Sequence, residues 1–277
     1  MQACNAGPIG VFDSGYGGLT ILKEIRRVLP QYDYLYLGDN ARAPYGPRSF
    51  DIVYRFTLEA VRFLFSRGCR LVILACNTAS AKALRSIQQN DLPHIDPSRR
   101  VLGVIRPTAE AIGKLTSTGN IGVLGTSGTV SSGSYDMEVE KLYPGYKVTS
   151  LACPMWVPLV ENMEADGPGA DYFVDKYVRE LIESDESVDT VILACTHYPL
   201  LYDKIRKYMP EHIKVVCQGD IVAESLKDYL TRHPEMESCC SRGGRCEYLT
   251  TENPEKFTGL GRVFLNEDVE ATHVEID

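Results

Sequence analysis

The sequence predicts an α/β protein of two similar domains, each a mostly parallel sheet flanked by helices. Three observations support this: short apolar runs alternate with helical patterns, turns rich in glycine and polar residues separate them, and two segments of the chain repeat each other. Alternating strands and helices are typical of parallel sheets covered by helices. A chain of 277 residues has room for one large domain or two smaller ones.

The first part of the chain repeats one pattern of strand, turn and helix. Within residues 8–28, an apolar run leads into "DSGYGG" and then into apolar residues at helical spacing. "DYLYLGD" precedes a helix whose apolar residues extend from Phe50 to Leu64 and which Gly68 ends. "RLVILA" leads to Cys76, and "NTASAKAL" can begin the next helix.

Five later runs have the same strand-like character, namely "RVLGVI", "NIGVLG", "KVTSLA", "TVILAC" and "IKVVCQGD". Two matches link the early and late runs. Ile9 and Ile121 begin matching "IGV" triplets 112 residues apart, and Cys76 and Cys195 end matching "VILAC" runs 119 residues apart. The similar offsets predict two related halves.

We predict that residues 1–98 and 211–277 form the first domain, which carries Cys76, and that 99–210 form the second, which carries Cys195. The first boundary follows the polar stretch "NDLPHIDPSRR". The chain after Pro210 is too short for a third domain. It is therefore expected to complete the first one through "IKVVCQGD" and a helix from Ile221 to Leu230.

The composition limits the partners. A formal net charge of -8 disfavours broad binding to nucleic acid or to an anionic membrane, because both attract basic surfaces. The N-terminus lacks a basic segment followed by a long apolar run, and no later run approaches the roughly 18 apolar residues of a membrane helix. A cytoplasmic protein with a small-molecule partner is expected, and a homodimer is left open.

Nine cysteines without framework-like spacing favour reduced thiols over a disulfide scaffold. The "CCSRGGRC" segment lacks a CxxC pair and a spaced histidine, which disfavours a zinc site and predicts a polar surface loop. Its cysteines are Cys239, Cys240 and Cys246. Buried, inert thiols are predicted for a second group: Cys4, Cys69, Cys153 and Cys217.

Two cysteines stand apart because of their position. In parallel sheets, ligands bind beyond the carboxyl ends of the strands, where helix N-termini offer free N–H groups. Cys76 and Cys195 lie at such ends, and residues able to bind a carboxylate follow each. Similar residues recur after other strands. The polar residues predicted to form a pocket for a small anion are Asp13, Ser14, Asn77, Thr78, Thr126, Ser127, Thr129, Thr196 and His197.

The matched cysteines predict a reaction. Nearby helix-terminal N–H groups are expected to favour the thiolates and lower their pKa from about 8.5. If the halves face each other across a cleft, one thiolate can remove a proton from a tetrahedral carbon while the opposing thiol protonates the other face. The outcome is inversion of configuration. The alternative is that both cysteines are merely buried small side chains.

Seven segments, in order along the chain, resemble the glutamate racemases of the aspartate/glutamate racemase superfamily: "GVFDSGYGGLT", "YLGDNARAPYG", "LVILACNTASA", "IGVLGTSGTVSSGSY", "ACPMWVPLVEN", "LACTHYPLL" and "TTENPEKF". The resemblance implies two α/β domains with the active site in the cleft between them. It also implies interconversion of L- and D-glutamate without pyridoxal phosphate, metal or another cofactor. In bacteria this activity would supply D-glutamate for peptidoglycan.

The resemblance implies roles for individual residues. Cys76 and Cys195 would be the acid/base thiols, with Asp13 near Cys76 and with Glu161 and His197 near Cys195. The predicted substrate-binding residues are Asp13, Ser14, Tyr45, Gly46, Asn77, Thr78, Thr126, Thr129, Thr196 and His197. Without the resemblance, simpler roles would suffice: Asp13 as a helix cap, Glu161 as a solvated carboxylate, His197 as a packed or capping residue, and Tyr45-Gly46 as a turn.

Some positions depart from the family pattern. Tyr16 stands where a valine is frequent, Arg106 replaces a frequent glutamate, and Gln218 lies in a turn that usually contains serine. Two other functions stay open, namely a racemase acting on aspartate or another amino acid and a catalytically silent anion-binding homologue. A redox dithiol is disfavoured because neither motif contains CxxC.

Overall fold

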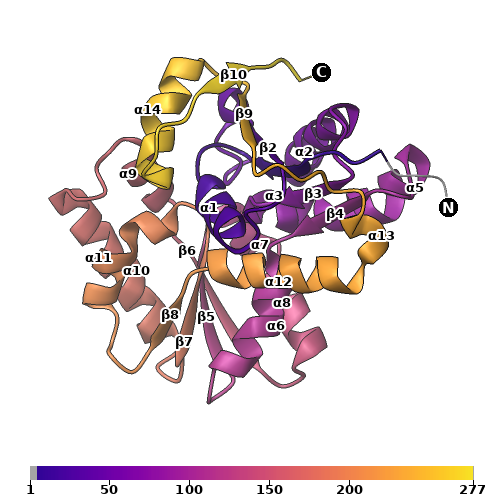
Figure 1. The fold of residues 1–277 in the computed structure, drawn as a ribbon. Helices are drawn as coiled ribbons and strands as arrows, with labels where there is room; N and C mark the ends of the chain where they lie inside the picture. Colours follow the sequence, from indigo (N-terminus) through magenta and orange to yellow (C-terminus); the bar gives the residue numbers. More distant parts are fainter. Residues whose placement is uncertain (1–4, 277) are drawn as a thin grey trace.

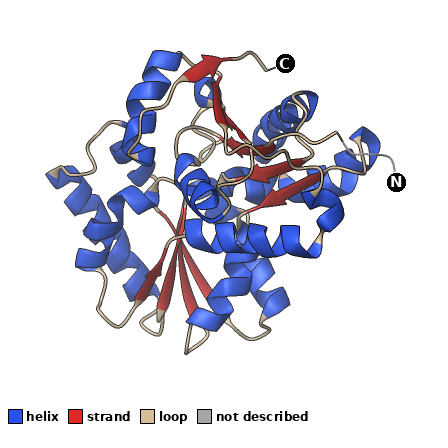
Figure 2. Cartoon of the chain, viewed as in Figure 1, coloured by secondary structure: helices blue, strands red, loops and turns tan. Residues whose placement is uncertain are grey.

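The computed structural model describes residues 5–276, which form two parallel sheets covered by helices (Figure 1; Figure 2). The first sheet has the order β10-β9-β2-β1-β3-β4. Every residue of β1, β2 and β3 is buried, because helices cover both faces of a parallel sheet. Its strands are β1 (Ile9–Asp13), β2 (Tyr34–Gly38), β3 (Leu71–Leu74), β4 (Arg100–Gly103), β9 (Cys246–Thr250) and β10 (Ala271–His273).

The second sheet has the order β6-β5-β7-β8. Its strands are β5 (Asn120–Gly125), β6 (Lys147–Ala152), β7 (Thr190–Ala194) and β8 (Lys214–Val216). The order β2-β1-β3-β4 in the first sheet matches the order β6-β5-β7-β8 in the second. Cys76 comes two residues after β3 and Cys195 one residue after β7, so the two cysteines occupy corresponding places.

Two strands, β4 and β8, do not lie in the sheet that the sequence predicted for them. β4 was expected in the second domain, but it pairs with β3, with Leu71 opposite Arg100. β8 was expected to return to the first domain, but it pairs with β7, with Thr190 opposite Lys214. The reason is that each half contains four matching strands, whereas the sequence-based division ended each half one strand early. A two-domain division that crosses after β4 and after β8 is therefore our proposal.

Helices flank both sheets (Figure 1). Those between β1 and β4 are α1 (Leu19–Val28), η1 (Asn40–Arg42), α2 (Phe50–Ser66), α3 (Asn77–Lys82), α4 (Leu84–Ser86), the π-helical η2 (Ile87–Asp91) and α5 (Leu92–Ile95). The predicted end of α2 is confirmed: the helix stops at Ser66, and Gly68 takes a φ of +92°, which glycine adopts without strain.

The helices between β4 and β8 are α6 (Ile105–Leu115), α7 (Ser127–Ser131), α8 (Ser134–Leu142), α9 (Trp156–Glu161), α10 (Pro168–Ser184), η3 (Tyr198–Leu201) and α11 (Tyr202–Tyr208). Those after β8 are α12 (Gly219–Arg232), α13 (Pro234–Glu237) and α14 (Pro254–Leu265). α12 packs against α1, so the chain returns to the first sheet from α12 onward. Among residues 5–276, no helix has the length and apolar character needed to cross a bilayer.

The "CCSRGGRC" segment is only in part the polar surface loop that was predicted: Arg242 to Arg245 are exposed, whereas its two ends belong to the fold. Cys239 and Cys240 are buried, and the Gly7 N–H donates to the Cys239 carbonyl over 3.0 Å. Cys246 begins β9. Backbone pairing with the chain just before β1 therefore draws this segment into the fold.

Four other cysteines were expected to be buried and inert. Cys69 and Cys153 are buried, Cys217 is half-buried, and Cys4 lies outside the described residues. Cys239 is disulfide-bonded, so the expectation of reduced thiols is wrong for this residue.

Candidate active site

A cavity of about 210 Å³ lies at the carboxyl ends of strands from both sheets. Ser14 follows β1 and Cys76 follows β3, while Thr126 and Cys195 follow β5 and β7. All four residues line the cavity. The two cysteines thus contribute to one cavity from corresponding ends of the two sheets, as the chain's internal repeat predicts.

Cys76 is the N-cap residue of α3 and is 6% exposed. Its Sγ lies 3.4 Å from Ser14 Oγ and accepts a hydrogen bond of 3.4 Å from the Ala79 N–H. Burial, followed by the negative charge of Asp13, raises the pKa of Cys76 to about 12 despite these hydrogen bonds. The predicted lowering of this pKa is therefore wrong, because loss of solvation outweighs the helix-terminal N–H. Cys76 is a neutral thiol at pH 7.

Cys195 has a basic neighbour. Its Sγ lies 3.9 Å from His197 Nδ1, and His197 Nε2 lies 2.9 Å from Glu161 Oε1. Burial lowers the pKa of His197, but hydrogen bonds with Cys195 and Glu161 outweigh it and raise the pKa to about 10. The histidine is therefore an imidazolium at neutral pH.

Asp13 lies behind the cavity wall. It is fully buried, and its Oδ2 accepts a hydrogen bond of 2.9 Å from the Gly15 N–H, while its Oδ1 has no hydrogen-bond partner. Burial raises the pKa of Asp13 although the charge of His197 opposes this. Gly18 is the N-cap residue of α1, so Asp13 does not cap that helix.

Three threonine hydroxyls meet at one side of the cavity. Thr78 Oγ1 lies 2.9 Å from Thr126 Oγ1, and Thr129 Oγ1 lies 3.1 Å from Thr126 Oγ1. Thr78 and Thr126 line the cavity, whereas Thr129 stands behind them. Because Thr78 belongs to α3 and Thr126 precedes α7, this cluster joins the two halves.

The remaining predicted binding residues all line the cavity: Ser14, Tyr45, Gly46, Asn77, Thr196 and His197. The Tyr45 hydroxyl donates to Asp39, so this hydroxyl is already bonded within the protein. No group of three or more His, Cys, Asp or Glu side chains within residues 5–276 is arranged to hold a metal ion.

Sequence reasoning missed the less polar part of the wall. The cavity is also lined by Gly15, Ala43, Pro44, Pro47, Cys153, Pro154, Val157 and Pro158. Most of these residues carry no reactive group, so composition alone gave no reason to select them. All of them except Pro47 nevertheless lie in segments that carried the family resemblance: "GVFDSGYGGLT", "YLGDNARAPYG" and "ACPMWVPLVEN".

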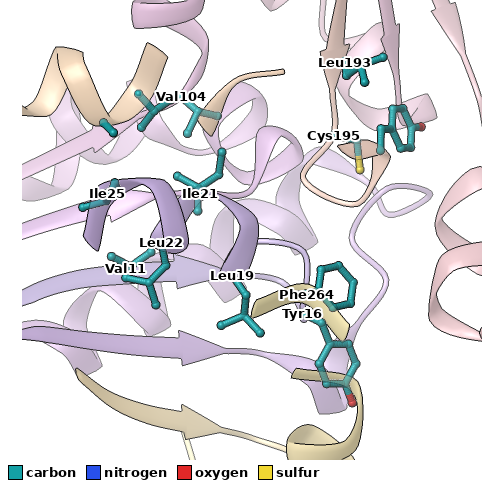
Figure 3. Packing of buried hydrophobic residues seen from close by; sticks show 14 of the residues in the cluster. Val11, Tyr16, Leu19, Ile21, Leu22, Ile25, Val104, Leu193, Cys195 and Phe264 are labelled. Atoms are coloured by element: carbon teal, nitrogen blue, oxygen red, sulfur yellow. The ribbon is translucent and has the colours of Figure 1, made fainter. Parts of the chain in front are cut away.

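An aromatic layer supports His197 from behind. Its ring lies 5.4 Å from that of Phe264 in an edge-on arrangement, and Phe264 stacks on Tyr16 at 6.3 Å. Figure 3 shows Tyr16 and Phe264 together below the loop that carries Cys195. Phe264 belongs to α14, so the C-terminal helix helps to position a residue of the second half.

Comparison with known proteins gives a consistent result. The family model described as Asp/Glu/Hydantoin racemase matches residues 16–226. The glutamate racemase of Streptococcus equi subsp. equi is 39% identical over 273 residues, which is 97% of this chain and 98% of the relative.

Solved structures agree. Glutamate racemase isoform RacE1 from Bacillus anthracis aligns with a TM-score of 0.89 and 35% identity, covering 98% of both chains. Glutamate racemase from Francisella tularensis in complex with D-glutamate aligns with a TM-score of 0.87 and 29% identity, covering 99% of this chain and 98% of that one. On these matches the chain belongs to the Asp/Glu/hydantoin racemase family.

Proposed function

We propose that this protein is a cofactor-independent glutamate racemase that uses Cys76 and Cys195 as its two proton carriers. The observation that supports this most directly is that both thiols line one cavity from corresponding strand ends, in contrasting surroundings. Glutamate is the substrate proposed because the matched relatives are glutamate racemases and one was solved with D-glutamate.

The contrast between the thiols suits the chemistry. Cys195, beside the His197 imidazolium, acts as the base in its thiolate form, and Cys76, a buried neutral thiol, acts as the acid. The thiolate takes the α-proton, so that the Cα–H bond breaks, an S–H bond forms and the electron pair stays on carbon. The thiol on the opposite face then gives its proton to the carbon. In the reverse direction, the cysteines exchange roles.

Removing an α-proton is difficult because the negative charge must be stabilised as it develops. The hydroxyls of Ser14, Thr78 and Thr126 lie at the cavity wall and can hold the α-carboxylate. Closing the cavity against water would strengthen these interactions. Asp13 and Glu161 act on the thiols indirectly. The charge of Asp13 lies near Cys76, and Glu161 contacts His197, the neighbour of Cys195.

We further propose that the product D-glutamate serves peptidoglycan synthesis and that the enzyme works in the cytoplasm. A reducing compartment suits a reaction that depends on two free thiols.

The test is racemisation in deuterated water by purified protein without added cofactor. Either enantiomer of glutamate should acquire deuterium at the α-carbon while the circular dichroism of the solution decays to zero. Cys76→Ala and Cys195→Ala should each abolish racemisation. Cys69→Ala and Cys217→Ala are the controls and should keep it, because neither thiol lines the cavity. Full activity of either cavity variant would overturn the two-thiol assignment.

A further inference from the structure

A buried ring of hydrogen bonds joins Asn77, Gln218 and Tyr135. Asn77 Nδ2 donates to Gln218 Oε1 over 2.6 Å, Gln218 Nε2 donates to the Tyr135 hydroxyl over 2.7 Å, and this hydroxyl donates to Asn77 Oδ1 over 2.7 Å. The second N–H of Gln218 donates to Thr108 Oγ1 over 2.9 Å. Each of these four side chains is at most 2% exposed.

The ring satisfies its members without conflict. The donors and acceptors follow one another in the same direction around the ring, and the Thr108 hydroxyl donates a hydrogen bond to the Val104 carbonyl over 2.6 Å. Bonds arranged head to tail polarise and strengthen one another in a medium of low dielectric constant. Leaving one of these buried polar groups unpaired would be costly. The orientation of the Asn77 amide is therefore fixed.

The ring forms where the chain crosses between the sheets. Gln218 precedes α12, just after β8, and Thr108 lies on α6, just after β4. Asn77 begins α3 and directly follows Cys76. Gln218, in the segment after β8, therefore bonds both to Thr108, in the segment after β4, and to Asn77, the residue that follows Cys76.

Asn77 also lines the cavity. Its Oδ1 and one hydrogen on its Nδ2 are used by the ring, which leaves the second Nδ2 hydrogen in a fixed direction. We propose that Gln218 is a positioning residue that holds this remaining Asn77 N–H as a hydrogen-bond donor to the carboxylate of the substrate. The inference rests on the proposed function for the identity of the substrate.

The main test compares Gln218→Leu with wild type in the racemisation assay. Leucine fills similar space but can make none of the three bonds. KM for glutamate should rise about tenfold, which corresponds to one weakened hydrogen bond to a charged group. A merely structural loss would reduce the amount of active enzyme and leave KM unchanged. The same substitution at Gln88, which makes one bond to the Val101 carbonyl, is the control and should leave KM unchanged.

A double-mutant cycle separates positioning from stability. In an Asn77→Ala background, Gln218→Leu should raise KM no further, because the amide that it orients is gone. An equal rise in both backgrounds, or no rise in either, would overturn the inference. If Gln218→Leu does not fold, Tyr135→Phe replaces it, since this variant removes the hydroxyl that accepts from Gln218 Nε2 and donates to Asn77 Oδ1.

A readout without substrate separates this inference from the proposed function. The NMR signals of the Asn77 side-chain amide, assigned by their loss in Asn77→Ala, should be protected from solvent exchange in wild type and unprotected in Gln218→Leu. Protection together with a lack of glutamate racemisation would refute the function and uphold the ring. Equal exchange in the two proteins would refute the ring.

Discussion

The two cavity cysteines differ in what surrounds them. Cys76 is flanked by buried Asp13 and by neutral donors, whereas Cys195 lies near a histidine that a carboxylate holds in its charged form. The difference arises from the residues after each strand, since Asn77 and Thr78 follow Cys76 while Thr196 and His197 follow Cys195. The residues after the cysteine have thus diverged between the two copies of the motif, so the proposed proton carriers have unlike surroundings.

His197 should impose a limit at high pH. Its pKa is raised from 6.5 to about 10, so the charged contact is fully present below 6.5 and is lost as the pH rises through about 10. We expect both kcat/KM and Tm to fall over that upper range. His197→Gln should lower kcat roughly 100-fold and flatten this alkaline decline. His233→Gln, which changes an exposed histidine, should keep the decline, and a wild-type profile that stays flat to pH 11 would contradict the assignment.

At the scale of single residues, the sequence alone was enough to select part of the candidate site. Cys76 and Cys195 could be selected because strand ends and small polar residues are visible in one sequence. Gln218 could be noted only as a departure from a family pattern. Its partners Asn77, Thr108 and Tyr135 lie between 83 and 141 residues away along the chain, and no local pattern reports which side chains meet at such separations.

Among the elements, the turn from β1 into α1 fits most tightly against the second half. A Cβ at Gly17 would lie 2.2 Å from Thr196 Oγ1 and 2.4 Å from His197 Nδ1. Glycine is therefore required at this position by close approach rather than by backbone conformation. The turn that contains Gly17, in the first half, therefore constrains Thr196 and His197, which follow Cys195 in the second half.

Gly17→Ala should therefore damage catalysis more than folding. The added methyl group displaces Thr196 and His197, and a shift of about 1 Å in such groups can cost roughly 100-fold in rate. Far-ultraviolet circular dichroism should remain that of wild type. Gly259→Ala, at an exposed position of α14, is the matched control, because nothing lies within 4 Å of its Cβ position, and it should keep full activity. Equal activity of the two variants would argue against the close contact.

The strands themselves were predictable, but their sheet membership was not. Runs such as "RVLGVI" and "IKVVCQGD" carry the composition of buried strands, which indicates the element and not its neighbour. β4 joins β3 and β8 joins β7 because the repeated unit contains four strands. This repeat is visible in the sequence only for the strands that carry the "IGV" and "VILAC" matches.

At the scale of the whole molecule, stability depends in part on carboxylates that accept several hydrogen bonds. Asp189 accepts bonds from the N–H groups of Ser117 and Thr118 and from the hydroxyl of Thr116. Burial alone would raise the pKa of Asp189, but these bonds outweigh it and lower the pKa. The carboxylate ties the loop before β5 to the start of β7.

Asp189→Asn should lower the free energy of unfolding by about 1 kcal/mol at pH 7, because a charged acceptor of several hydrogen bonds becomes a neutral amide. A lowered pKa contributes stability above the unfolded value of 3.8 that is lost as the pH falls. The difference between variant and wild type should therefore shrink below pH 4. Urea titrations of variant and wild type at pH 7 and pH 3 measure this difference in unfolding free energy. Asp203→Asn, at an exposed position, is the control. A difference that is constant with pH would contradict the carboxylate's role.

The return of the chain to its first sheet has a consequence for biosynthesis. β9, β10 and α14 come last, and Phe264 of α14 supports His197, more than sixty residues earlier in the sequence. A ribosome therefore has to synthesise and release the chain through Phe264 before the His197 ring can pack against that aromatic side chain. Nascent chains that stall short of α14 would carry both thiols and still lack a finished catalytic centre.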